Sequence, residues 1–352
     1  MSYWYYAIDK YKHTMIRTIL SVVFILCVCS FAKAQDPVFS QFYASPTLLN
    51  PAFTGSVGAP RINLQSRFQW PSFDAYKTYA ASFDTYFREA KSGLGLYVMS
   101  DIQGEGFIST SEIKGMYSYQ LNMRNNWSVR FGTEVGFGQK FYDWDKYVFL
   151  DQIDPITGSV ADQSFSEEQR PESLQANYFD ISSGILFASK TVYAGLSLRH
   201  MNRGNDGVIL LNENRLSNGV PLMVSAQFGT QINFNKGNKR KSGSFISPNV
   251  LIVKQGDFGQ VNAGAYISSS FVFGGVWYRY SWTNADAAVF MLGVQSGVFK
   301  LGYSYDYTVS ALQAYSGGGA HEIAVSFRFD QSEYFKNKAK KYNSIDCLQL
   351  FR

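Results

Sequence analysis

Residues 127–137 read WSVRFGTEVGF, in which the odd positions are apolar or Thr and the even positions are polar, charged or Gly. Because successive side chains of a β-strand point to opposite sides, this alternation predicts a strand with one apolar and one polar face. The same alternation recurs in residues 222–234 and 299–307. The chain is therefore predicted to consist largely of two-faced strands.

Many of the strand segments reach ten or more residues, whereas strands of soluble proteins average roughly five or six. Ten residues are enough to cross the hydrocarbon of a bilayer at a tilt. We therefore predict an all-β fold, a transmembrane antiparallel β-barrel of about 14 strands spanning residues 61–330. The predicted strands are residues 61–70, 75–87, 92–102, 107–121, 127–141, 176–189, 191–201, 220–235, 244–254, 257–271, 274–282, 287–295, 299–307 and 320–330.

The connections between these strands fall into two groups. An even number of strands returns the chain to its starting side, which for bacterial barrels is the periplasm, and the outer loops are usually longer than the periplasmic turns. The sequence follows this rule, with one basic connection of moderate size, residues 236–243, as the exception. The predicted outer loops include residues 142–175, 202–219 and 308–319, and the predicted periplasmic turns include residues 88–91, 122–126 and 296–298.

Charged residues of the strands fall on the polar phase and are predicted to point into the lumen, where water or opposite charges solvate them. These residues are Arg67, Arg130, Glu134, Arg199, Arg279, Lys300, Asp306, Glu322 and Arg328. They either brace a closed interior or line the water path of a porin-like channel or transporter for small solutes. Aromatic residues near strand ends suit interfacial girdles: Trp70, Tyr86, Trp127, Trp282 and Tyr307.

The first 34 residues are predicted to be a signal peptide, with Met15 as the true start and cleavage after Ala34. The apolar run over residues 19–29 is too short for a transmembrane helix. Removal of the leader leaves 28 basic and 26 acidic residues, so a nucleic-acid partner is not expected. Cys347 is then the only cysteine, which excludes an internal disulfide. Residues 331–352 are predicted to form a basic periplasmic tail.

Residues 35–60 separate the leader from the first strand, and their polar sequence is interrupted by Pro37, Pro46 and Pro51. Such a segment is unsuited to a lipid-facing strand, because Pro cannot donate to a sheet ladder. We predict that it packs at or inside the periplasmic mouth. There it closes the lumen as a plug, or it offers Phe39, Phe42, Tyr43 and Phe53 to a partner.

No catalytic function and no cofactor are expected. His200 and His321 are the only histidines outside the leader, and no nucleophile-elbow sequence lies near either. A phospholipase-like barrel is the nearest enzymatic alternative. The loop over residues 142–175 contains several Asp residues, of which Asp151 and Asp154 are weak candidates for a calcium site. Their spacing does not match an EF-hand, and an exposed acidic loop is the simpler interpretation.

Three further stretches carry recognisable wording: residues 35–55, beginning QDPVFSQFY and ending LLNPAFTG, residues 149–154 (FLDQID), and residues 180–201. In these stretches the chain resembles the PorP/SprF family of the type IX secretion system of Bacteroidetes. The resemblance implies an outer-membrane, non-enzymatic protein that supports protein secretion, gliding motility or the surface attachment of cargo such as adhesins. It also implies contacts with lipid and with other secretion components, either periplasmic ring subunits or a secreted surface protein. The sequence does not distinguish a core component of the secretion system from an accessory protein that serves one particular cargo.

By motif position, the resemblance assigns candidate partner-binding residues to two places in the chain. They are Phe39, Gln41, Phe42, Asn50, Pro51 and Phe53 near the N-terminus, and Asp151, Gln152 and Asp154 in the long outer loop.

Overall fold

The computed structural model describes residues 36–154, 157, 159–160, 166–171, 173–202, 221–234, 244–282, 284–309, 318–332 and 334–335. The predicted leader, residues 203–220 of one outer loop, the whole basic turn at 236–243 and most of the tail lie outside the described residues. Among the described residues, no helix is long and apolar enough to cross a membrane.

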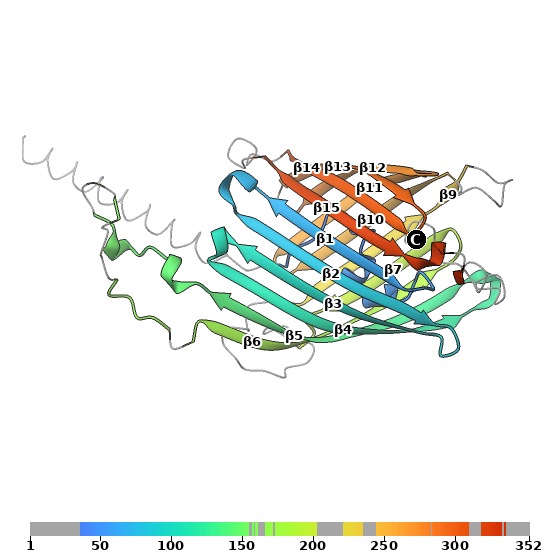
Figure 1. Ribbon diagram of the computed structural model, residues 1–352, viewed down its shortest axis with the longest axis horizontal. Coiled ribbons are helices and arrows are strands. Elements are labelled where there is room, and N and C mark those ends of the chain that lie inside the picture. The colour runs from blue at the N-terminus through green and yellow to red at the C-terminus, as the bar shows by residue number, and fades with distance from the viewer. Residues whose placement is uncertain are drawn as a thin grey trace, which may run out of the picture. The chain divides into compact units, whose positions relative to one another are not determined.

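The described residues form a closed antiparallel β-barrel (Figure 1). Each strand pairs with its neighbours along the chain, β1 with β15 and β10 with β11 complete the ring, and β8 and β9 both pair with β10. The strands are β1 Arg61–Gln69, β2 Tyr76–Phe87, β3 Ser92–Gln103, β4 Ile108–Asn122, β5 Ser128–Tyr142, β6 Gln175–Ala188, β7 Val192–Arg199, β8 Met223–Thr230, β9 Ile232–Asn233, β10 Phe245–Gln255, β11 Phe258–Ser269, β12 Val272–Ser281, β13 Asn284–Ser296, β14 Phe299–Thr308 and β15 Ala320–Arg328.

All fourteen predicted strands are confirmed, most of them to within two residues at each end. A break at Gln231 divides the eighth predicted strand into β8 and β9, and the pairing of β12 with β13 shifts register between Arg279 and Tyr280. The end of the barrel that holds the β5–β6 and β7–β8 connections is called the loop end here, and the end that holds the β2–β3 and β4–β5 turns is called the turn end.

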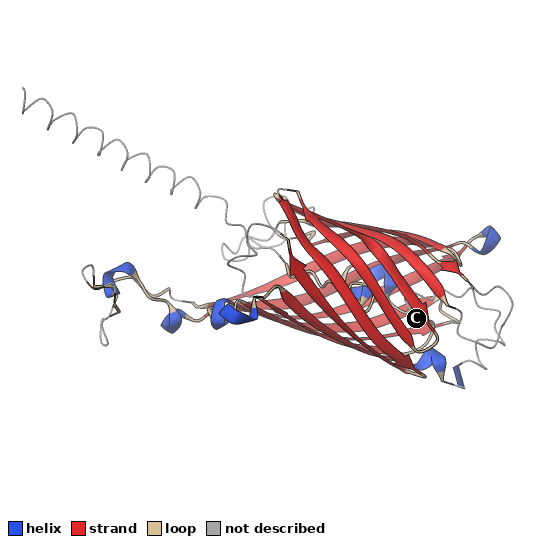
Figure 2. Cartoon of the chain, turned by 90° about the horizontal axis from the view of Figure 1, so that it is seen from above, coloured by secondary structure: helices blue, strands red, loops and turns tan. Residues whose placement is uncertain are grey.

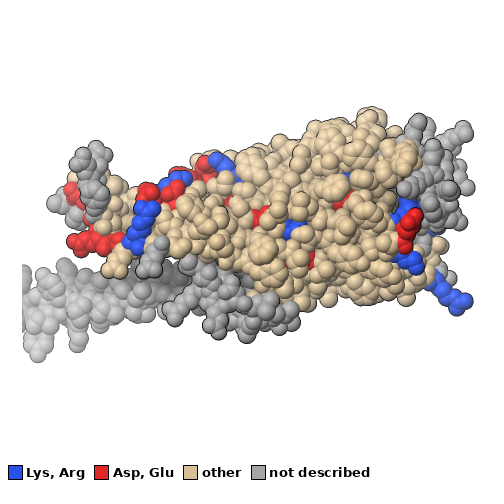
Figure 3. Space-filling model, turned by 60° about the horizontal axis from the view of Figure 1, so that its bottom comes forward, with Lys and Arg blue, Asp and Glu red and all other residues tan. Residues whose placement is uncertain are grey.

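The direction of the side chains is that of a membrane barrel. In β5, Phe131 on the outer phase is 47% exposed while Arg130 on the inner phase is 3% exposed. All nine charged residues that were predicted to face the lumen are buried. The wall seen in Figure 3 carries few charged side chains. A soluble β-sandwich would bury the apolar face of its strands and expose the polar face. The exposed apolar face is therefore the feature that fits a lipid environment.

Only some of the residues that were predicted to form interfacial girdles point outward. Trp127, Trp282 and Tyr307 are exposed on the outer face. Tyr86 was wrongly assigned to the girdle, because it shares the inner phase of β2 with Asp84, and the guanidinium of Arg130 lies over its ring at 5.0 Å. An aromatic ring near a strand end therefore indicates a girdle only when its phase is outward.

Residues 36–60 lie inside the barrel (Figure 2). The segment begins at the loop end, beside His200, which follows β7, and Gln255, the last residue of β10. It leads into β1 at the turn end. It contains two short 3-10 turns, Pro46–Leu48 and Pro51–Phe53. The prediction of a segment limited to one mouth was therefore too narrow, because the segment runs between both ends of the lumen.

Candidate functional site

Residues 36–60, called the luminal segment from here on, contact every strand that crosses the barrel. Only the two-residue strand β9, which continues β8, is not among the contacts. The contacted residues, from β1 to β15, are Arg67, Asp84, Gly93, Ser118, Gly132, Ile185, Ser197, Gln227, Gln255, Tyr266, Trp277, Met291, Asp306 and Glu322.

Near its start, the luminal segment binds a buried cluster of wall charges. The backbone N–H groups of Ser40 and Gln41 donate to the carboxylate of Glu322 at 2.8 and 2.9 Å. The Ser40 hydroxyl donates to Asp306 at 2.6 Å. Arg67 pairs with Asp306 at 2.9 Å and with Glu322 at 3.2 Å, so the wall neutralises its own carboxylates. Hydrogen bonds to charged acceptors are stronger than neutral ones, and these bonds fix the segment to β14 and β15.

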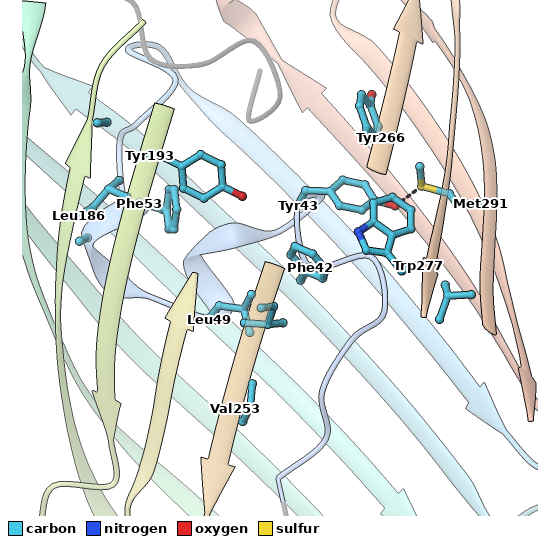
Figure 4. Packing of buried hydrophobic residues seen from close by; sticks show 14 of the residues in the cluster. Phe42, Tyr43, Leu49, Phe53, Leu186, Tyr193, Val253, Tyr266, Trp277 and Met291 are labelled. Carbon is cyan, nitrogen blue, oxygen red and sulfur yellow. Dashed lines mark hydrogen bonds between the residues drawn. The ribbon is translucent and has the colours of Figure 1, made fainter. Parts of the chain in front are cut away.

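Further along, two aromatic residues pack into the wall (Figure 4). The ring of Tyr43 stacks on Trp277 with centroids 5.1 Å apart and lies 5.3 Å from Tyr266. Phe42 meets Trp277 edge to face at 6.2 Å. The Tyr43 hydroxyl also contacts the sulfur of Met291. These contacts join the segment to β11, β12 and β13, on a different side of the lumen from β5 to β7.

Asn50 has two structural tasks. Its side-chain oxygen accepts a hydrogen bond from the N–H of Ala52 at 2.9 Å and so caps the Pro51–Phe53 turn. Its side-chain nitrogen lies within hydrogen-bonding distance of the carbonyls of Ile185 and Leu196, at 3.2 and 3.3 Å. One side chain thus shapes the segment and attaches it to β6 and β7.

Wall glycines make room for the segment. A Cβ added to Gly132 would lie 2.2 Å from the nitrogen of Ala52, and one added to Gly93 would lie 2.3 Å from the carbonyl oxygen of Thr54. Both neighbours are backbone atoms, which cannot turn aside as a flexible side chain can. At Gly184, the added Cβ would lie 2.1 Å from the Asn50 side-chain oxygen. The segment lies so close to β3, β5 and β6 that only glycine fits there.

The last part of the segment is tied to the turn end. Asp84 forms a buried pair with its cross-strand neighbour Arg61 at 2.8 Å and accepts the N–H of Gly55 at 2.7 Å. The carbonyl of Thr54 accepts the hydroxyl of Ser118 at 2.7 Å. The chain is thereby held on β2 and β4 just before it enters β1.

A second buried charge cluster lies where the segment begins. Lys114 pairs with Glu112 at 2.9 Å and with Asp180 at 2.8 Å. His200 lies between Asp180, at 3.0 Å, and Asp36, the first described residue of the segment. Both ring nitrogens of His200 therefore face carboxylates. His321 lies on the outer phase of β15, with its Nδ1 at 2.7 Å from the Tyr303 hydroxyl.

The β5–β6 connection, residues 143–174, extends beyond the wall at the loop end and is called the arm here (Figure 1). Asp151 accepts hydrogen bonds from the backbone N–H of Glu167, at 2.6 Å, and from the hydroxyl of Ser166. These donors hold the pKa of Asp151 below its usual value. Asp154 accepts the N–H of Thr157 at 3.2 Å. The described part of the chain contains no group of three or more His, Cys, Asp or Glu residues that could hold a metal ion.

The family profile of type IX secretion system membrane proteins PorP/SprF matches residues 31–327. The chain belongs to the PorP/SprF family. The family and the closed barrel with its apolar outer face place this PorP/SprF protein in the outer membrane. No curated protein matches the chain.

The barrel is also similar to solved structures of low sequence identity. A Pseudomonas aeruginosa FadL homologue is 11% identical, with a TM-score of 0.41 over 80% of this chain and 93% of its own. BamA from Haemophilus ducreyi lacking POTRA domains 1–3 is 12% identical, with a TM-score of 0.36 over 77% and 70%. A Rhodopseudomonas blastica porin triple mutant is 6% identical, with a TM-score of 0.31 over 76% and 98%.

The candidate residues of this PorP/SprF protein lie in two separate places. Phe39, Gln41, Phe42, Asn50, Pro51 and Phe53 are buried in the lumen, whereas Asp151, Gln152 and Asp154 lie on the arm. In this conformation, the first group contacts the barrel wall and is not presented at a surface. The interpretation that these aromatic side chains are offered to a partner therefore does not fit the conformation that the structure describes.

Several residues that hold the luminal segment were not foreseen from the sequence. Ser40 and the wall glycines Gly93, Gly132 and Gly184 are the main examples. The available signal was weak: Gly132 and Gly184 lie on the inner phase of mid-strand positions, where a missing side chain often marks the close approach of another backbone.

Proposed function

We propose that the protein is a non-enzymatic component of the type IX secretion system that acts through protein contacts, with its lumen closed by the luminal segment. In this role it supports the secretion or the surface attachment of cargo proteins such as adhesins. The observation that supports this most directly is the luminal segment itself, which contacts every strand crossing the barrel and leaves the wall as a scaffold.

A porin role requires a continuous water path. A cavity between the luminal segment and the wall, lined by Phe39, Phe42 and Arg199 among others, has a volume of about 20 Å³. That volume holds about one water molecule, because a single water needs at least about 10–15 Å³ measured in this way. The close packing supports a closed barrel over the alternative of a channel for small solutes.

We also infer the orientation and the processing of the chain. The turn end faces the periplasm, and cleavage after Ala34 leaves Gln35 as the first residue of a chain whose translation begins at Met15. The tail over residues 331–352 then lies in the periplasm. The partners are other secretion components, namely periplasmic ring subunits or a secreted surface protein. Mass spectrometry of the N-terminal peptide of the purified barrel tests the cleavage site directly.

The secretion role is tested by deleting the gene in its native host and by restoring it in trans. We expect the deletion to reduce cargo proteins at the cell surface or in the medium, measured by surface labelling and quantitative mass spectrometry. The restored gene should return them to the wild-type level. A deletion strain whose surface and medium proteins match those of the parent would refute the role.

The closed lumen is tested by ion conductance in planar bilayers. The purified protein should leave the bilayer current at its baseline. Large and steady openings of the intact protein would instead favour the channel alternative, and selectivity measurements with small solutes would then define it.

A further inference from the structure

The arm is a folded connection that is held by hydrogen bonds to its neighbours. At its base, the N–H of Asp143 donates to the carbonyl of Phe107 at 2.9 Å. The Lys146 ammonium donates to the carbonyl of Glu105 at 2.9 Å. Both partners belong to the β3–β4 connection, so the arm is fixed to its neighbouring hairpin as well as to β5 and β6.

Aromatic side chains give the arm a small core of its own. The rings of Trp144 and Phe149 lie 4.9 Å apart, and Tyr147 lies 5.2 Å from Phe107 and 6.3 Å from Phe149. The side-chain oxygen of Gln152 accepts the N–H of Phe149 at 2.8 Å and closes the following 3-10 turn. The family motif at residues 149–154 therefore has a structural task, which is to shape this turn.

The same turn leaves apolar side chains uncovered. Leu150 is 89% exposed, Val148 is 54% exposed, and Val160, which pairs with Ile153 in a β-bridge, is 50% exposed. The carboxylates beside them are held by hydrogen bonds within the arm, as Asp151 is by Ser166 and Glu167. The arm thus stabilises a shape that keeps Leu150 in contact with solvent. This exposure is unfavourable, because the free energy falls when an apolar side chain leaves water.

The charge of the arm limits what can cover these side chains. Residues 143–174 contain eight Asp or Glu and two Lys or Arg, a formal charge of −6. Acidic side chains are visible on the arm in Figure 3. An anionic lipid headgroup would be repelled by this charge, whereas a cationic protein surface would be attracted and guided toward it.

We propose that the arm is the docking surface for a cationic protein whose apolar pocket takes up Leu150. This inference rests on the proposed function for the kind of partner, a secretion component or a cargo protein at the loop end, and it adds a location and a chemistry. Leu150 with Val148 forms the apolar centre of the contact, and the surrounding carboxylates form its charged rim, the arrangement that most protein interfaces have.

The test uses the full-length chain in its native host, with the photo-crosslinking residue p-benzoylphenylalanine in place of Val148. We expect a covalent adduct with a protein whose cross-linked peptide is rich in Lys and Arg. The substitution Leu150→Asp should reduce that adduct at least tenfold. Because Leu150 is almost fully exposed, this substitution should leave the barrel folded, which is checked by its heat-dependent shift in gel mobility.

Phe73 provides the matched control. It is also exposed and apolar, at 56%, and it lies in the β1–β2 connection at the same end of the barrel. The crosslinker at Phe73 should not give the adduct, and Phe73→Asp should leave the adduct at residue 148 unchanged. Adducts with lipid, no protein adduct at residue 148, an acidic contact peptide, or an adduct that survives Leu150→Asp would each overturn the inference.

Experiments with the same strains show whether the docking surface or the secretion role is wrong. If the gene deletion leaves secretion unchanged while the adduct forms as expected, the secretion role fails and the docking surface stands. If the deletion reduces secretion while the arm gives no adduct, the docking surface alone fails.

Discussion

Gly132→Ala is the sharpest test of how the luminal segment is held. The added Cβ would lie 2.2 Å from the nitrogen of Ala52 and 2.3 Å from the carbonyl carbon of Pro51, both backbone atoms of the second 3-10 turn. Ordinary contacts of a Cβ begin near 3.4 Å, so the turn must move by about 1 Å or more. Such a shift removes Phe53 from its buried position and stretches the hydrogen bonds of Asn50.

The expected cost follows from those two losses. Burial of a Phe side chain stabilises by about 1.5–3 kcal/mol. The cap and the bonds made by Asn50 each contribute about 1 kcal/mol. The seated state of the segment should therefore weaken by roughly 2–5 kcal/mol, and a loss of about 2.7 kcal/mol would raise the unseated fraction about 100-fold.

The assay is the rate of maleimide labelling at Ser56→Cys, a buried position of the segment, in a Cys347→Ser background. Gly132→Ala should raise this rate. Gly115→Ala is the matched control, because its Cβ would meet only the Val135 carbonyl oxygen at 3.9 Å. Equal labelling rates in the two variants would show that the close approach at Gly132 does not hold the segment.

The remaining predictions concern other attachments and the arm. Trp277→Ala removes the ring that stacks on Tyr43 and should lower the free energy of unfolding by about 3–5 kcal/mol, measured by urea titration in lipid vesicles. Arg61→Ala leaves the carboxylate of Asp84 buried without its pair and should cost about 3–5 kcal/mol in the same titration, whereas an unchanged midpoint would contradict the importance of this pair. The lowered pKa of Asp151 means that its bonds stabilise the arm above the unfolded pKa of about 3.9 and are lost as the pH falls through the lower folded value. Hydrogen exchange of peptides from the arm, corrected for intrinsic rates, should therefore lose protection in acid, and Asp151→Asn should remove this pH dependence.

The barrel could be predicted from the sequence because the alternation that defines each strand is visible among neighbouring residues. In β5, each apolar residue is separated by one polar or small residue, and this period defines the strand, its two faces and the outward phase together. The inner phase of Glu134 and Arg199 followed without any knowledge of their partners. Tyr86 was misplaced because its position near a strand end was given more weight than its phase.

The path of the luminal segment could not be predicted, because it depends on contacts between distant parts of the chain. Ser40 meets Asp306 and Asn50 meets Gln227, more than 170 residues further along in each case. An irregular segment has no period that fixes the direction of its side chains. Pro37, Pro46 and Pro51 excluded a strand and suggested a plug, but only the three-dimensional structure shows that the segment runs between both ends of the lumen.

The charged residues of the lumen belong almost entirely to the wall and not to the luminal segment. From residue 36 to residue 60, the luminal segment has one charged side chain, that of Asp36, and it contributes mainly backbone N–H groups, carbonyls, hydroxyls and aromatic rings. The ion pairs of Arg67 with Glu322 and of Lys114 with Asp180 join wall to wall. These pairs do not need the segment, and lumen water can solvate them if it leaves. The segment therefore adds a seal to a wall in which these charges already pair with one another, and for that reason a substitution such as Gly132→Ala should unseat the segment without dismantling the barrel.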